Sequence, residues 1–284
     1  MRTLSVCILL VSIFTLITCD RGIDKPTTVQ PTPDSGKKFV LPSSDLPPSA
    51  HHIQHVDYFG KSISGINHFI LKAIDSVQAH APDGGGYFIG ITGTPPESPV
   101  RYNLHLFDQA LIEIPRQSSY CSGATYTAFI EALNMMLGGE SNRLSAARFE
   151  ALRMQEPDGS RREDHVKFWG HWNADGYGNH YALVQYSKMG AVKPPPEALP
   201  GDFVNISWKS GGGHSVIFLA WTEIDGDPKI VYWSSQKATN GYGDQIVSLS
   251  RIKVLKVVRL MNLENLFRFN PNEAVESEVT GDSI

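Results

Sequence analysis

Cys121 and His214 are the two residues of this chain whose side chains suit nucleophilic chemistry. The chain has three cysteines, and the other two, Cys7 and Cys19, lie in or beside an N-terminal apolar segment. A cysteine thiolate attacks a carbonyl carbon and a histidine takes the thiol proton, so a Cys–His pair supports amide hydrolysis or acyl transfer. The competing interpretation of an isolated cysteine is a small buried core residue.

The segment around Cys121 predicts a helix that begins at or near this cysteine. Apolar residues recur at helical spacing until Gly138 and Gly139, namely Ala124, Tyr126, Phe129, Ile130, Leu133 and Met136. The N-terminus of a helix carries a partial positive charge and free N–H groups, which lower the pKa of a thiol and can hold an oxyanion. We therefore expect Cys121 to be an activated nucleophile.

His214 begins an apolar strand directly after three glycines, Gly211 to Gly213. Glycine lets a backbone or a substrate approach closely, and a histidine in this place is poorly explained as core filling. We expect His214 to act as a general base. A fold in which the helix packs on a sheet would bring it to Cys121.

A third catalytic residue is expected on the strand that follows His214. The turn signal Asp225-Gly226-Asp227 predicts a hairpin, and folding about it sets Ser234 and Gln236 on the same face as His214. A glutamine oxygen can accept the imidazole N–H and fix its tautomer, so Gln236 is the first candidate. The alternatives are Ser234 and Asn240, or a polar loop at residues 235–243 without a catalytic role.

Three short motifs carry a resemblance to a known group of enzymes. They are Tyr120-Cys121-Ser122-Gly123, Pro200-Gly201-Asp202 and Gly213-His214-Ser215-Val216, in this order. The set resembles the papain-like cell-wall peptidases and amidases of bacteria, of the NlpC type and of the cysteine, histidine-dependent amidohydrolase/peptidase (CHAP) type. The chain departs from their pattern in a long insertion at about 143–200 and in lacking the family's histidine on the next strand.

The resemblance implies both a fold and an activity. The fold would be α+β and papain-like, with the nucleophile at a helix N-terminus packed on an antiparallel sheet. The activity would be hydrolysis of an amide bond in peptidoglycan stem peptides, without a cofactor or a metal, in a substrate cleft at Tyr120, Ser122 and Gly213. Two other functions stay open: a non-catalytic lipoprotein that binds cell wall or glycan, and an acyltransferase that uses the same Cys–His pair.

The N-terminus predicts export from the cytoplasm. Arg2 is followed by an apolar run, Leu4 to Thr18, of the length of a signal-peptide core and short for a membrane span. Leu16-Ile17-Thr18-Cys19 resembles a bacterial lipobox, although Thr18 departs from it. We expect residues 1–18 to be a lipoprotein signal peptide and Cys19 to carry the lipid that anchors the chain in a bacterial cell envelope. Ordinary cleavage or an uncleaved anchor remain alternatives.

Composition sets the class of the remaining chain. The net charge is −4, with 25 Lys+Arg against 29 Asp+Glu, so the basic excess of nucleic-acid binders is missing. Residues 19–50 are rich in proline and predict a disordered tether, and residues 272–284 predict an acidic flexible tail. Residues 51–271 then form the catalytic domain, with His51, His52 and His55 on the surface where it begins.

The predicted elements place helices before strands, which is typical of an α+β domain. Helices are expected at 63–77 and 143–154, and strands at 87–92, 104–114, 202–208, 215–222, 229–235 and 252–260. His165, His171, Asp175 and His180 match no common zinc spacing. The aromatic residues near them either fill a core or line a cleft; they are Trp169, Trp172, Tyr177 and Tyr181.

Overall fold

The computed structural model describes residues 38–88, 94, 98–158, 168–170 and 178–276. All described residues belong to one compact unit, which lies within residues 31–284. Several predictions lie outside the described residues: the signal peptide, Cys19, the tether up to residue 37, and the group His165, His171, Trp172, Asp175 and Tyr177. Within the described part, no helix combines the length and apolar character needed to cross a membrane.

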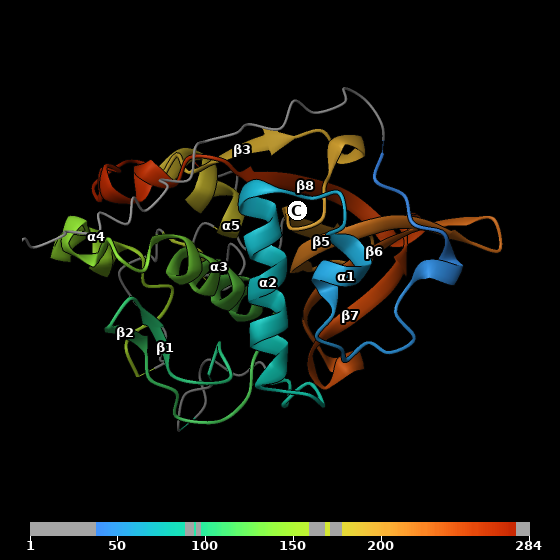
Figure 1. The fold of residues 1–284 in the computed structure, drawn as a ribbon, viewed down its shortest axis with the longest axis horizontal. Helices are drawn as coiled ribbons and strands as arrows, with labels where there is room; N and C mark the ends of the chain where they lie inside the picture. Colours follow the sequence, from blue (N-terminus) through green and yellow to red (C-terminus); the bar gives the residue numbers. More distant parts are fainter. Residues whose placement is uncertain (1–37, 89–93, 95–97, 159–167, 171–177, 277–284) are drawn as a thin grey trace, which may run out of the picture. The chain divides into compact units, whose positions relative to one another are not determined.

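An antiparallel sheet of six strands forms the centre of the described unit, in the order β3, β8, β4, β5, β6, β7 (Figure 1). The strands are β3 Gly190–Lys193, β4 Phe203–Trp208, β5 Gly213–Ile224, β6 Asp227–Gln236, β7 Gly241–Ser248 and β8 Ile252–Leu260. A separate hairpin consists of β1 Leu104–Leu106 and β2 Gln109–Ile112. The α+β class predicted from the sequence is confirmed.

Helices α2 and α3 cross each other on one side of this sheet (Figure 1). The helices are α1 His55–Phe59, α2 Gly65–Ala79, α3 Cys121–Leu137, α4 Ala146–Ala151 and α5 Gly178–Tyr181, which continues into a π-helical turn, Ala182–Tyr186. The predicted helices at 63–77 and 118–137 are confirmed. The predicted helix at 143–154 is shorter, since it begins after Ser145, whose side chain accepts from the Arg148 N–H.

The sheet is buried on both faces because apolar residues occupy both sets of alternating positions. One face, with Phe203, Ile217 and Trp233, joins α2 and α3 in the main core. The other face holds a second apolar cluster that includes Val216 and Tyr232. Each fully buried large side chain contributes about 1.5–3 kcal/mol. The two clusters together hold β5 and β6 in place as a support for the residues at their ends.

The side chains of the β5–β6 hairpin lie on the predicted faces of the sheet, because its pairing register differs from the predicted one by two residues in total. Its turn pairs Ile224 with Asp227, one residue away from the predicted pairing about Gly226. An irregularity between Phe218 and Ala220 then shifts the register by one more residue. A shift of one residue reverses the face and a second restores it. Gln236 therefore lies on the same face as His214, as predicted.

Residues 38–50 are ordered, so the prediction of a disordered tether is wrong for this part. The backbone of Phe39 accepts from the Trp221 N–H at 3.0 Å, and the Leu41 N–H donates to Trp221 at 2.9 Å. The pairing of β4 with β5 ends at Ile217, so this segment takes the place beside β5 that β4 leaves open. Phe39 and Leu41 also pack on the core. Their apolar side chains supply the burial that composition alone did not reveal.

Three further expectations also need correction. The predicted strand at 104–114 is the hairpin of β1 and β2, reversed at Phe107, whose φ is 55°. Part of the polar stretch 235–243 belongs to β7, which pairs with β6 from Lys229 to Gln236. The start of the predicted flexible tail is held in place, since Gln185 exchanges two hydrogen bonds with the backbone of Glu276 and Val275 packs on the core.

Candidate active site

Cys121 is the first residue of α3, as the sequence predicted. Tyr120, before it, is extended, with φ −138° and ψ 173°, so the helix starts abruptly at the cysteine. The backbone of Pro99 crosses the first turn so closely that a Cβ on Gly123 would lie 1.5 Å from the Pro99 carbonyl oxygen. The glycine of the Cys-Ser-Gly motif thus permits the backbone of Pro99 to pass close to the first turn of α3.

The thiol of Cys121 lies near the part of β5 that extends beyond its pairing with β6. Backbone pairing of these strands runs from the turn only as far as Ile217 and Trp233. At Ser215, beyond this point, the backbone N–H faces the Cys121 sulfur closely enough to act on the pKa of the thiol, and the carbonyl oxygen accepts from Ser234 Oγ at 2.7 Å. The thiol therefore lies near the backbone of the residue that follows His214.

Two hydroxyl pairs hold the three candidate residues in position through their chain neighbours. Thr125 Oγ1, in the first turns of α3, lies 2.9 Å from Ser215 Oγ, next to His214. Ser119 Oγ, two residues before Cys121, lies 2.8 Å from Ser235 Oγ, next to Gln236. All four side chains are buried. Sequence reasoning missed these residues, because isolated serines and threonines carry no spacing signal that marks them as contacts.

Burial raises the pKa of the Cys121 thiol above its ordinary value, although the backbone N–H groups of Ser215, Ser122 and Cys121 act against this. Cys121 is only 7% exposed. The sequence argument predicted a lowered pKa at the helix N-terminus, and this prediction is wrong because the loss of water outweighs the helix amides. The resting side chain at neutral pH is the thiol.

His214 lies between two aromatic rings at the start of β5. Its ring centroid is 6.2 Å from that of Trp208 and 5.5 Å from that of Tyr232. Burial lowers the pKa of His214 to about 4, against a smaller opposing contribution from its hydrogen bond to Gln236. The imidazole is therefore neutral at pH 7 and able to accept a proton.

The hydrogen bonds of Gln236 determine which nitrogen of His214 carries the proton. Gln236 Nε2 donates to Thr239 Oγ1 at 2.5 Å and to the Gly243 carbonyl oxygen at 3.1 Å. These acceptors direct the amide oxygen toward His214, whose Nε2 lies 3.3 Å away. Because this oxygen only accepts, Nε2 of the neutral ring is protonated. Nδ1 is left as the basic nitrogen.

The other predicted site residues have different surroundings. Ser234 uses its hydroxyl on the Ser215 backbone, and Asn240 is exposed in a left-handed conformation after the short helix η5, Lys237–Thr239. Neither is placed as a partner of His214 by the hydrogen bonds described here. Of the predicted cleft residues, Tyr120 and Ser122 are buried beside Cys121 and Gly213 is half-buried at the start of β5.

The Pro-Gly-Asp motif has a structural role. Asp202 is fully buried and accepts from Arg259 Nε and Nη2, both at 2.8 Å, from Asn67 Nδ2 at 2.8 Å and from the Leu199 N–H at 2.9 Å. Gly201 has φ +92°, and a Cβ there would lie 2.7 Å from the Asn67 carbonyl oxygen. The motif therefore joins α2, β4 and β8. Burial raises the pKa of Asp202, and the donors of Arg259, Asn67 and Leu199 act against this.

The aromatic residues of the insertion fill the core where they are described. Trp169 is fully buried against Phe129 and Phe203 and donates from Nε1 to Thr125 Oγ1 at 3.0 Å. Of the two interpretations of these aromatic residues, core filling holds for Trp169. Burial, with a further contribution from Lys256, lowers the pKa of His180 to about 3.

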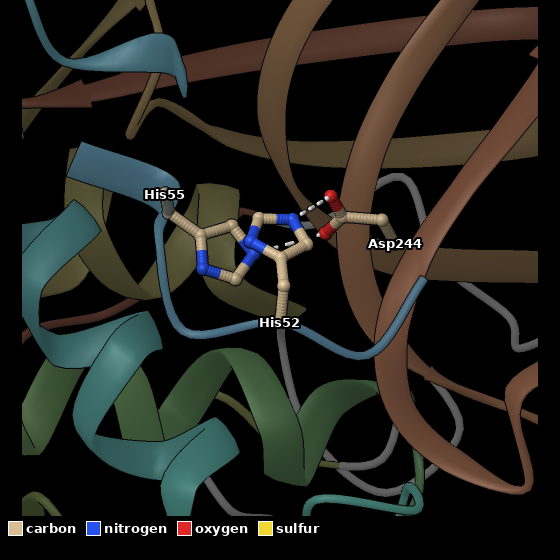
Figure 2. A group of neighbouring side chains, drawn as sticks. All are labelled: His52, His55 and Asp244. Atoms are coloured by element: carbon tan, nitrogen blue, oxygen red, sulfur yellow. Dashed lines mark hydrogen bonds and ion pairs between the residues drawn. The ribbon is translucent and has the colours of Figure 1, made fainter. Parts of the chain in front are cut away.

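His52, His55 and Asp244 form a cluster in which His55 is buried and His52 is half-buried (Figure 2). His55 Nδ1 lies 2.7 Å from Asp75 Oδ1, and its Nε2 lies 3.0 Å from Asp244 Oδ1. His52 Nε2 lies 2.9 Å from Asp244 Oδ2. His55 is fully buried, so the prediction that it lies on the surface is wrong. The carboxylates of Asp75 and Asp244 thus replace the hydrogen bonds that water would make to this imidazole in an exposed place.

These three side chains are close enough to hold a metal ion, but their orientation favours protons between them. The rings of His52 and His55 are stacked, with centroids 4.2 Å apart, and each Nε2 faces a different oxygen of Asp244. Lone pairs of stacked rings run side by side and do not converge on one ion. His52 Nδ1 also accepts from the Gln54 N–H at 3.2 Å, which places the proton of a neutral ring on Nε2.

The stability of the protein is expected to fall as the pH rises through about 9, because His55 then loses its proton. Burial lowers the pKa of His55, but Asp244 and Asp75 together with their hydrogen bonds raise it to about 9 from an ordinary 6.5. Because the folded-state pKa of His55 is above the unfolded value, the protonated imidazole contributes its full stabilisation below pH 6.5. This contribution is lost as the pH rises through about 9. The change is on the order of 3 kcal/mol.

Urea unfolding of the full chain between pH 6 and pH 10 measures this loss. His55→Gln is expected to flatten the pH dependence, whereas His80→Gln, on the exposed end of α2, should leave it unchanged. Equal slopes in wild type and His55→Gln would contradict the assignment of a charged His55. The titratable side chains that face His55 are Asp75, Asp244 and His52. No lysine or arginine side chain takes part in the described hydrogen bonds of this cluster.

The structure thus brings His214 and Gln236 within hydrogen-bond distance at the ends of β5 and β6, and it places Cys121, the first residue of α3, near the backbone of Ser215. Among the described residues no hydrogen bond joins the Cys121 thiol to the His214 imidazole. The thiol and the imidazole are both neutral at rest, and Gln236 orients the imidazole. A comparison of the chain with protein-family models, with curated proteins and with solved structures finds no match in any of the three.

Proposed function

We propose that this protein is a cysteine hydrolase that cleaves an amide bond, with Cys121 as nucleophile, His214 as general base and Gln236 as the residue that orients the base. The observation that carries the proposal is the hydrogen bond between Gln236 Oε1 and His214 Nε2, in a histidine whose chain neighbour Ser215 faces the Cys121 thiol with its backbone N–H. A core-filling histidine needs no such amide partner, whereas a general base that serves a nearby nucleophile needs its tautomer fixed.

The reaction starts from the neutral pair. His214 Nδ1 takes the thiol proton as the sulfur attacks the carbonyl carbon, and the N–H groups of Cys121 and Ser122 donate to the oxyanion. The imidazolium then gives its proton to the departing amine, and the C–N bond breaks to leave a thioester. Water, deprotonated by His214, hydrolyses the thioester and restores the thiol. Gln236 stabilises the imidazolium because its oxygen accepts from Nε2 throughout.

The resemblance of the three motifs supports a papain-like fold and a peptidoglycan stem peptide as the substrate. The described helix, sheet and order of the motifs agree with this proposal, as does Cys121 at a helix N-terminus. We place the enzyme in the envelope of a bacterium, anchored through Cys19 after removal of residues 1–18. Neither a cofactor nor a metal enters the proposed reaction.

A second candidate function is favoured by the burial of the thiol. Cys121 is 7% exposed and burial raises its pKa, as expected for a structural cysteine in a protein that binds cell wall or glycan without chemistry. Such a protein would keep the fold and the contacts of Asp202. An acyltransferase would keep the Cys–His pair and transfer the acyl group to an acceptor other than water.

Alkylation of Cys121 and hydrolysis of peptidoglycan, measured on the full chain, separate these functions. We expect iodoacetamide to label the peptide that contains Cys121 in the folded protein, faster as the pH rises, and purified peptidoglycan to release new amine and carboxyl groups. His214→Ala should slow both, and His80→Ala should slow neither. Labelling only after unfolding, with no amine released, would establish the binding protein; amine release without new carboxyl groups would establish the acyltransferase.

A further inference from the structure

Both acceptors of the Gln236 amide are themselves attached to a segment far away in the chain. Gln236 Nε2 donates to Thr239 Oγ1 and to the Gly243 carbonyl oxygen. The backbone carbonyl of Thr239 lies 2.9 Å from His51 Nε2. Asp244, next to Gly243, donates its N–H to the Ala50 carbonyl oxygen at 2.9 Å. Residues 50–55, termed here the N-terminal strap, thus contact the chain at both places that supply an acceptor to the Gln236 amide, Thr239 and Gly243.

The attachment of the strap to β7 is strengthened by the histidine cluster (Figure 2). His52 and His55 bind the two oxygens of Asp244, and Asp75 on α2 holds the far side of His55. Charge-assisted hydrogen bonds of this kind are about twice as strong as neutral ones. The strap is therefore fixed both to α2 and to β7. Thr239 and Gly243 connect it to the Gln236 amide.

We propose that the N-terminal strap positions the Gln236 amide and thereby sets the tautomer of His214; this inference rests on the proposed function of His214 as a base. When Thr239 Oγ1 and the Gly243 oxygen are in place, Gln236 presents its oxygen to Nε2, and Nδ1 is left to take the thiol proton. When they move, the amide can turn and donate an N–H to His214, which places the proton on Nδ1 and removes the base.

The strap residues are positioning residues, since they act through Gln236 and touch no reacting atom. Thr239 is the direct link, because its Oγ1 donates to the Gly241 carbonyl oxygen at 2.6 Å and so turns a lone pair to the Gln236 N–H. His51 and His52 are the links that can be removed while the buried pair of His55 and Asp75 stays intact. They are half-buried, and their loss leaves the two apolar clusters unchanged.

Nitrogen chemical shifts of His214, read from long-range ¹H–¹⁵N spectra of the labelled full chain at pH 7, test the proposal without any substrate. We expect a single Nε2–H tautomer in wild type and a mixture with Nδ1–H in His51→Ala/His52→Ala and in Thr239→Val. Thr239→Ser should restore the wild-type spectrum, and His80→Ala should not change it. Hydrolysis by the two altered variants should fall about tenfold in kcat, with a smaller change in KM.

The tautomer and the activity report on different claims. A wild-type His214 in the Nε2–H form that shifts in the variants supports the strap even if no amide is hydrolysed, in which case the proposed function fails alone. An unchanged tautomer in His51→Ala/His52→Ala, with Thr239→Val shifted, would overturn the role of the strap. If the double variant does not fold, as judged by its circular dichroism, His51→Ala alone decides, because it removes the contact to Thr239 and leaves Asp244 untouched.

Discussion

Replacing Cys121 with alanine is expected to lower amide hydrolysis by ~10⁴-fold or more while the protein stays folded. The thiol is the only atom proposed to form a bond to the substrate, so nothing else on the described chain replaces it. The small side chain fits the same space, because Cys121 forms no disulfide and no described side-chain hydrogen bond depends on its sulfur. Initial rates of amine release, with unfolding followed by circular dichroism, measure both parts.

His214→Ala is expected to cause a loss of similar size, and the double variant Cys121→Ala/His214→Ala no more than either alone, because residues that act as one unit lose their effect together. The pH profile of the wild type adds a second check. Because burial lowers the pKa of His214 to about 4, activity should rise through about pH 4 on its acidic side rather than near 6.5. Full activity in Cys121→Ala would exclude Cys121 as the nucleophile.

Asp202→Ala is expected to destabilise the fold by about 3–5 kcal/mol. It removes a buried carboxylate that holds Arg259 through two hydrogen bonds, and it leaves the guanidinium group without its charged partner, bonded to the Glu197 carbonyl oxygen. The same change frees Asn67 and the Leu199 N–H. Equilibrium unfolding in urea measures the loss.

A double-mutant comparison separates the buried charge from the packing around it. Asp202→Ala/Arg259→Met removes both charges and is expected to recover part of the stability, because no unpaired guanidinium remains. Asp227→Ala, which breaks the exposed pair with Lys229, is the matched control and should change stability little. A loss for Asp202→Ala as small as that of the control would contradict the structural role of the Pro-Gly-Asp motif.

Sequence periodicity predicted the elements that bury a regular apolar face. The helices around Ile74 and Phe129 and four of the five strands from Phe203 onward follow this rule, and so does the position of Cys121 at the start of α3. Strand β7 was missed because Gly241, Gly243 and Asp244 are among its first four residues, and their partners lie on β6 and in the strap. Pairing with distant residues, rather than local propensity, makes this segment a strand.

The residue types of the candidate site could be predicted from the sequence, but the burial of their side chains could not. The motif placed Cys121 and His214 correctly at the ends of their elements, yet the direction of the pKa shift of Cys121 depends on burial that only the fold determines. Gln236 was predicted on the same face as His214, and this holds because the observed hairpin register differs from the predicted one by two residues. His55 carried no sequence sign of burial, because its two carboxylate partners are 20 and 189 residues away.

The two edges of strand β5 end their pairing at different places. On one edge β6 pairs with β5 only from Ile217 to Ile224, and at Ser215 the carbonyl oxygen accepts from Ser234 Oγ instead. On the other edge β4 continues to pair as far as Gly213. Under the proposed function, a lineage of such proteins could therefore vary the side chains at 213–215 and acquire another specificity while the ladder with β4 preserves the fold.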